Sequence, residues 1–155
     1  MSQRSRGAIV SLDYEPYSVS PKHKLRVSNH KPKSTSDSKV LIIDDDLDLC
    51  LGLRIRLQAS YDTCFANDAA CGLSMAFTEM PDVIILDIGL PDCDGYFFLQ
   101  SLSEIPGLAG IPVIVLTARD RFPHEGRCRE AGARLFFQKP VDNHSLLLAI
   151  EQLVS

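Results

Sequence analysis

Charged and hydroxyl side chains follow four short apolar runs in this sequence. The acidic run Asp44–Asp46 follows one of them, and Asp87, Thr117 and Lys139 each follow another. Carboxylates gathered in one place repel one another unless a cation compensates their charge. Mg²⁺ prefers oxygen ligands and commonly binds one or two carboxylates together with phosphate oxygens. The set therefore predicts a divalent-cation site that handles a phosphoryl group.

Asp87 is the predicted nucleophile of this chemistry, because a carboxylate can attack phosphorus and form an aspartyl phosphate. A bound Mg²⁺ and the Lys139 ammonium would neutralise charge on the phosphoryl oxygens, and the Thr117 hydroxyl can donate one more hydrogen bond. An aspartate after a strand is more often a helix cap or a turn former. The prediction therefore depends on all these residues occurring at the same ends of successive strands.

The pattern around these residues predicts how the chain brings them together. Short apolar runs predict buried strands at 40–43, 61–66, 83–86, 112–116 and 135–137. Apolar residues at helical spacing, with turn and cap signals, predict helices at about 47–59, 69–80, after Gly95, from Pro123 to Gly132, and at 143–154. Strands and helices in alternation imply a parallel sheet with helices on both faces. Such sheets bind ligands beyond the carboxyl ends of their strands, where these side chains would lie.

Charge divides the chain near Lys39. Residues 1–39 contain eight Lys/Arg and three acids, whereas residues 40–155 contain eight Lys/Arg and seventeen acids, so their net charges are +5 and −9. The polar, serine-rich stretch before Lys39 predicts a disordered basic tail over residues 1–38, and residues 39–155 form the expected domain. The tail lacks the aromatic interleaving of nucleic-acid readers, so we do not expect nucleic-acid binding.

The other composition signals exclude several classes of protein. Five cysteines without C-x-x-C spacing and four histidines without paired spacing predict reduced thiols and no Cys/His metal site. No apolar run approaches the roughly 18 residues of a membrane-spanning helix. The apolar stretch Gly7–Val10 is shorter than the roughly 7–15-residue core of a secretion signal. A cytoplasmic protein without membrane insertion is therefore expected.

Four stretches resemble the receiver domains of bacterial two-component response regulators, in particular single-domain regulators of the chemotaxis type. They are Val40–Asp46, Val83–Gly95, Val113–Ala118 and Ala131–Pro140. The second stretch, with its L-P-x-x-D-G ending, is specific, and the Thr and Lys-Pro motifs follow it in order. The resemblance covers about residues 39–155. It implies a flavodoxin-like, doubly wound α/β fold, with a five-stranded parallel sheet in the order 2-1-3-4-5 and helices on both faces.

The resemblance also implies the phosphoacceptor and the metal ligands. Asp87 corresponds to the phosphoacceptor of the family. Asp44 and Asp45 correspond to its acid pair, so Mg²⁺ or Mn²⁺ is expected at Asp44, Asp45, Asp87 and the Gly89 backbone carbonyl. Asp46 has no implied role beyond capping a helix.

The switch positions follow from the same resemblance. Thr117, with Ala118 beside it, and Lys139 correspond to the switch and phosphate-binding positions. Phe136 corresponds to the aromatic residue that turns inward on activation. The face made by the fourth helix, fifth strand and fifth helix is then expected to bind a downstream protein target, and a phosphorylation-dependent homodimer is a further partner of this kind.

Two features depart from the family pattern. Gly89 and Arg119 lie two residues past the phosphoacceptor and the switch threonine, where side chains influence the lifetime of the phosphoryl group. Gly89 does not indicate whether this lifetime is long or short, whereas Arg119 could shield or reposition water. The second departure is the basic tail, because family members normally begin almost directly with the first strand.

The implied function is to accept a phosphoryl group from a sensor histidine kinase or a phosphotransfer protein, and not to turn over a substrate as an enzyme. Because the sequence ends directly after the last helix, it fits either a stand-alone receiver or a piece of a longer protein.

Two rival hypotheses remain. A phosphohydrolase of the haloacid-dehalogenase type would use Asp44 in its D-x-D motif, but it needs an acid pair after the lysine, where only Asp142 and Glu151 remain. It also leaves Asp87 unexplained. A pseudo-receiver would keep the fold as a binding module without phosphorylation, but such modules usually lose an acid, the acceptor or the lysine, and none is missing here.

Deleting residues 1–38 should leave folding and phosphorylation nearly intact, because the predicted core begins at the first strand. Thermal denaturation and phosphorylation of the full and shortened chains would test this. A large loss of thermal stability would show instead that the apolar segment Ile9–Tyr17 packs on the domain.

Overall fold

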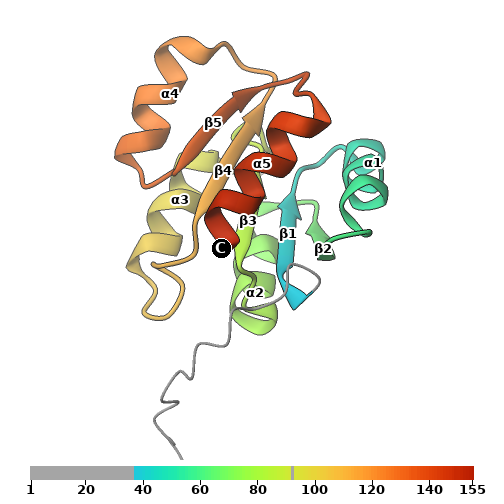
Figure 1. Ribbon diagram of the computed structural model, residues 1–155. Coiled ribbons are helices and arrows are strands. Elements are labelled where there is room, and N and C mark those ends of the chain that lie inside the picture. Colours follow the sequence, from blue (N-terminus) through green and yellow to red (C-terminus); the bar gives the residue numbers. More distant parts are fainter. Residues whose placement is uncertain (1–36, 92) are drawn as a thin grey trace, which may run out of the picture. The chain divides into compact units, whose positions relative to one another are not determined.

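Strands and helices alternate along the part of the chain that the computed structural model describes, residues 37–91 and 93–155 (Figure 1). The strands are β1 (Lys39–Ile43), β2 (Asp62–Ala66), β3 (Val83–Leu86), β4 (Val113–Thr117) and β5 (Leu135–Gln138). The helices are α1 (Leu47–Leu57), α2 (Ala69–Glu79), α3 (Gly95–Glu104), α4 (Arg121–Glu130) and α5 (Asn143–Val154). The predicted tail lies outside the described residues, except for Asp37 and Ser38.

The five strands form one parallel sheet in the order β2-β1-β3-β4-β5. Ile43 of β1 pairs with Leu86 of β3. Since Asp44 and Asp87 directly follow these two residues, the register brings both carboxylates to the same edge of the sheet. The predicted α/β class and the strand order 2-1-3-4-5 are confirmed.

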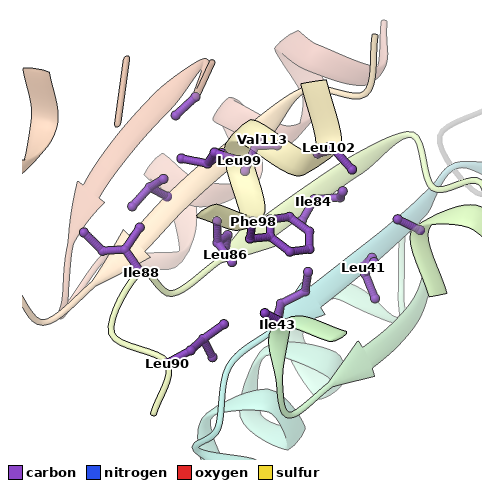
Figure 2. Close-up of a cluster of buried hydrophobic side chains, with 14 of the residues drawn as sticks. Leu41, Ile43, Ile84, Leu86, Ile88, Leu90, Phe98, Leu99, Leu102 and Val113 are labelled. Atoms are coloured by element: carbon purple, nitrogen blue, oxygen red, sulfur yellow. The ribbon is translucent and has the colours of Figure 1, made fainter. Parts of the chain in front are cut away.

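Helices cover both faces of the sheet. On one face, Phe98 of α3 is fully buried with side chains of β1 and β3, among them Ile43, Ile84 and Leu86 (Figure 2). On the other face, α1 and α5 pack on the opposite sides of the same strands, and α5 lies in front of the sheet in Figure 1. Burial on two sides explains why these strands are continuous apolar runs. Each fully buried Leu or Ile contributes about 1.5–3 kcal/mol.

Aspartate side chains begin four of the helices. Each accepts a hydrogen bond from a backbone N–H in the first turn and thereby satisfies a donor that the helix itself leaves unpaired. Asp46 accepts from the Leu49 N–H, Asp68 from the Cys71 N–H, Asp94 from the Tyr96 N–H and Asp142 from the Ser145 N–H. Helix capping therefore accounts for many of the acids near the strand ends, including the predicted cap Asp46.

The helix α4 begins differently. Asp120 precedes it without a side-chain cap, and Phe122 has non-helical backbone torsions, with φ −100° and ψ 127°. Regular helix therefore begins at Pro123, the residue that the sequence predicts for this position. Phe122 is 90% exposed. Cys128 is the only buried residue of α4, all of whose residues are described.

Helical spacing alone did not show which apolar residues face the sheet. In α1 the buried residues are Cys50, Leu53 and Leu57, whereas Leu47 and Leu51 are exposed. Apolar residues surround this helix, so its pattern predicts a helix without predicting its buried side. These exposed residues do not amount to a membrane span, since no helix in the described part of the chain is long and apolar enough to cross a bilayer.

The start of α3 passes very close to the loop after β3. A Cβ atom on Gly95 would lie 2.4 Å from the Ile88 Cα atom. We expect Gly95→Ala to lower the free energy of unfolding by about 1–3 kcal/mol, the usual cost of overpacking. Urea denaturation would measure it. The control is Gly52→Ala in α1, where a Cβ meets nothing within 4 Å, and which should stabilise by about 0.5–1 kcal/mol. Equal destabilisation in both variants would contradict this account.

Candidate functional site

Four strands deliver the predicted residues to one edge of the sheet. Asp44 follows β1, Asp87 follows β3, Thr117 ends β4, and Lys139 follows β5. Because β1, β3, β4 and β5 are consecutive neighbours in a parallel sheet, their carboxyl ends lie together. The residues come from positions up to 95 apart in the sequence. The topology, and not any local motif, therefore assembles the site.

Three carboxylates form a cluster at this edge. One oxygen from each of Asp44, Asp45 and Asp87 lies within 4.8 Å of the others. Asp44 is 3% exposed and Asp87 is 8% exposed, whereas Asp45 lies at the surface. Opposite ligands of a Mg²⁺ ion are about 4.2 Å apart, given its usual ligand distances. The donor set is therefore all oxygen and close to the required spacing, and it fits a hard divalent cation.

The ammonium of Lys139 bridges the two buried acids. Its Nζ atom donates to Asp44 Oδ2 at 2.6 Å and to Asp87 Oδ2 at 3.0 Å. The Lys139 side chain is largely buried, so water screens the attraction within both ion pairs less than it does in surface pairs. Lys139 therefore compensates part of the negative charge and ties the end of β5 to the ends of β1 and β3.

Burial and pairing act in opposite directions on the charges. Burial raises the pKa of Asp44, and the hydrogen bonds from Lys139 and from the Asp46 N–H offset only part of this rise. Burial alone would lower the pKa of Lys139, but its bonds to Asp44 and Asp87 outweigh burial, so the pKa of Lys139 is raised. Lys139 therefore stays an ammonium at neutral pH.

Backbone N–H groups hold the remaining carboxylate oxygens. The Gly89 N–H donates to Asp87 Oδ1 at 2.8 Å, and the Asp46 N–H donates to Asp44 Oδ1 at 2.9 Å. A Cβ on residue 89 would lie only 3.2 Å from Asp87 Oδ1, so glycine leaves room beside this oxygen. Each buried carboxylate is thus held by one backbone donor and by Lys139.

Thr117, the last residue of β4, is buried, with 1% of its surface exposed. Its hydroxyl oxygen accepts a hydrogen bond from the Arg119 N–H at 3.3 Å, and its carbonyl accepts one from the Lys139 N–H at 2.8 Å. Ala118 and Arg119 are exposed. The hydroxyl is therefore engaged by its own loop, on the strand next to the one that leads to Asp87.

Phe136 lies on β5, opposite Val115 of β4. Its side chain is half-buried and packs against the core cluster that contains Phe98. It is the aromatic residue expected from the family resemblance, on the strand beside the one that ends at Thr117.

Sequence reasoning did not find Cys50 as a neighbour of the site. Its buried thiol donates to the Asp44 carbonyl at 3.4 Å. Burial, together with the Asp44 and Asp46 carboxylates, raises the pKa of Cys50 to about 11, so it remains a thiol at neutral pH. In the sequence, Cys50 stands out only as a small apolar residue within the predicted helix. None of the five cysteines, all of which lie in the described part of the chain, is in a disulfide.

Known proteins match both the sequence and the fold. The protein PilH of Pseudomonas aeruginosa is 29% identical over 119 residues, which are 76% of this chain and 98% of PilH. The response regulator PleD of Caulobacter vibrioides is 32% identical over 117 residues, 75% of this chain, but the chain spans only 26% of the length of PleD.

Solved structures agree with these matches. A CheY-like response regulator receiver domain protein from Methanospirillum hungatei superposes with a TM-score of 0.71 at 27% identity, covering 77% of this chain and 94% of that one. The chemotaxis response regulator CheY4 of Vibrio cholerae gives a TM-score of 0.70 at 25% identity, covering 76% and 99%.

The family comparison completes the assignment. The profile of the response regulator receiver domain matches residues 40–151, which include the three acids, Thr117 and Lys139. The match begins within β1 and ends within α5, so it spans the whole sheet. Such domains act in two-component signalling and are not enzymes in the usual sense. The chain belongs to the response regulator receiver domain family, with Asp44, Asp45 and Asp87 forming the acidic triad typical of its members.

Proposed function

We propose that this domain accepts a phosphoryl group on Asp87 from a phosphohistidine of a sensor histidine kinase or a phosphotransfer protein. An Asp87 carboxylate oxygen forms the bond to phosphorus, the phosphorus–nitrogen bond breaks, and the leaving imidazole takes up a proton. The observation that carries this proposal is the fixed position of Asp87, whose two oxygens are held by the Gly89 N–H and by Lys139 at the edge of the acidic cluster.

Accessibility favours Asp87 over Asp44 as the nucleophile. The Asp87 side chain is 11% exposed and the Asp44 side chain 4% exposed. Burial also raises the pKa of Asp44, which makes its charged, nucleophilic form less favourable. Asp44 is better placed as a metal ligand, because a cation would favour its ionised form.

Charge compensation is the main requirement of this transfer, because a carboxylate must approach an anionic phosphoryl group. The proposed ligands of Mg²⁺ or Mn²⁺ are the carboxylates of Asp44, Asp45 and Asp87 and the Gly89 carbonyl. When bound, the cation would offset charge on the phosphoryl oxygens. Lys139 is in place to pair with one of these oxygens, since its Nζ atom already lies 3.0 Å from Asp87 Oδ2.

The signal would pass through Thr117. Its hydroxyl would leave the Arg119 N–H and donate to a phosphoryl oxygen, with Ala118 moving alongside. The vacated space would let Phe136 turn inward and reshape the face formed by α4, β5 and α5. Such a change is a population shift, so phosphorylation needs to favour the active arrangement by only a few kcal/mol.

The reshaped face is the proposed binding surface for a downstream protein target, and a phosphorylation-dependent homodimer is a second occupant that the proposal includes. Gly89 and Arg119, which flank the site, are proposed to set the lifetime of the phosphoryl group. Two-component signalling of this kind would place the domain in the cytoplasm.

Phosphorylation of Asp87 can be measured directly. With Mg²⁺ and acetyl phosphate, the protein should gain one phosphoryl group that is stable in acid and labile in base, detected by intact-protein mass. Asp87→Ala should abolish the gain. Label that persists in Asp87→Ala but disappears in Asp44→Ala would favour a hydrolase of the haloacid-dehalogenase type.

The affinity for Mg²⁺ should depend on Asp45 but not on its neighbour Asp46. Asp45→Ala should weaken Mg²⁺ binding and slow phosphorylation severalfold, because one carboxylate ligand is lost. Asp46→Ala is the matched control: it removes the α1 cap, at about 0.5–2 kcal/mol of stability, but should keep Mg²⁺ affinity. Titration calorimetry and phosphorylation rates would measure both effects. Equal rates in Mg²⁺ and in chelator would refute the role of the metal.

The variants Thr117→Ala and Lys139→Ala test the conformational response separately from phosphorylation itself. Both variants should still accept a phosphoryl group, more slowly, because Asp87 remains. They should lose most of the change around Phe136, because they remove the groups proposed to follow the phosphoryl oxygens. NMR shifts on the α4–β5–α5 face, with and without the phosphate mimic beryllofluoride, would measure this. A response equal to that of the parent protein would show that the proposed route is wrong.

A further inference from the structure

A hydrogen bond joins the two helices that begin after Asp87 and Thr117. Tyr96 lies in the first turn of α3, and His124 lies in the first regular turn of α4. The Tyr96 hydroxyl and His124 Nδ1 are 2.6 Å apart. The two rings are stacked, with centroids 6.3 Å apart and planes inclined by 22°. This contact is a specific polar link between α3 and α4.

The link is reinforced from α4. The Arg127 guanidinium carbon lies 4.1 Å from the centroid of the Tyr96 ring, a cation–π contact. Burial raises the pKa of Tyr96, so its hydroxyl keeps its proton at neutral pH. Tyr96 is therefore held by three α4 side chains, with His124 and the Cys128 thiol at its hydroxyl and Arg127 on its ring.

One end of this link is anchored more firmly than the other. The start of α3 is fixed because Gly95 packs directly on Ile88, the residue after Asp87, and because Asp94 caps the Tyr96 N–H at 3.2 Å. The start of α4 has no side-chain cap and contains the non-helical residue Phe122. Only residues 118–122 separate Thr117 from the regular helix. A displacement of Thr117 would therefore be transmitted to His124.

We propose that the Tyr96–His124 pair is a latch that regulates phosphorylation of this site. It holds α4 against α3 in the arrangement in which the Thr117 hydroxyl accepts from the Arg119 N–H, and it opens when Thr117 moves toward the phosphoryl group. The latch rests on the proposed function of Asp87. Tyr96 and His124 are positioning residues, because they act through Thr117 and touch no reacting atom.

The affinity for beryllofluoride in the presence of Mg²⁺ measures how easily the site reaches its active arrangement. Tyr96→Phe removes only the latch hydroxyl and should raise this affinity about threefold to tenfold, as expected when the hydrogen bond to His124 is lost from the resting state. His124→Ala should act in the same direction. The matched control is Tyr61→Phe, a buried tyrosine in the core cluster under α1 and α5, which should leave the affinity unchanged.

A second measurement separates the latch from a general structural role. In a Thr117→Ala background, Tyr96→Phe should no longer change the beryllofluoride affinity, because the latch acts through Thr117. The same increase in both backgrounds would overturn the proposal.

The results also distinguish the latch from the proposed function of Asp87. If the parent protein does not bind beryllofluoride with Mg²⁺, the proposed function fails and the latch fails with it. If the parent binds but Tyr96→Phe binds equally or more weakly, the latch fails while Asp87 remains the proposed acceptor.

Discussion

Two buried carboxylates share a single ammonium at the edge of this sheet, and the rest of the site is arranged around that shared charge. Taking charges out of water is costly, and only close pairing and full hydrogen bonding offset the cost. Lys139 satisfies one oxygen of Asp44 and one of Asp87, while two backbone N–H groups take the others. Negative charge still exceeds positive charge, and the pKa of Asp44 is raised, mainly by burial and to a smaller extent by the charge of Asp87. The site is thus stable in its resting form but remains short of positive charge, which suits it to bind a cation.

The sheet makes this arrangement obligatory once the strands are paired. Ile43 and Leu86 are register partners, and Thr117 pairs with Gln138, so the residues after β1 and β3 and those at the ends of β4 and β5 meet in one place. This explains how much could be predicted. Continuous apolar runs predict buried strands. Once these strands are taken to be parallel, Asp44, Asp87, Thr117 and Lys139 are expected at the same edge, and no side-chain geometry is needed for that prediction.

The remaining features depend on packing that no sequence pattern encodes. Leu47 and Leu51 carry the same apolar signal as Leu53, but only the placement of α1 on the sheet decides which of them are buried. Cys50 reads as a small apolar residue, and its bond to the Asp44 carbonyl follows from the position of α1 beside the β1 end. The contact between Tyr96 and His124 joins two helices through residues that lie 28 positions apart in the sequence and whose types are common on protein surfaces.

The single buried side chain of α4 has a consequence for how stability is distributed over the fold. The other helices each bury at least three residues, whereas α4 buries only Cys128. Local opening free energies follow the number of buried apolar contacts, so α4 should belong to the least protected part of the domain in amide hydrogen exchange. The central strands would then exchange only through global unfolding. A domain built in this way can displace one helix while its core stays folded. The part that moves, α4, is then different from the central sheet, which provides most of the stability.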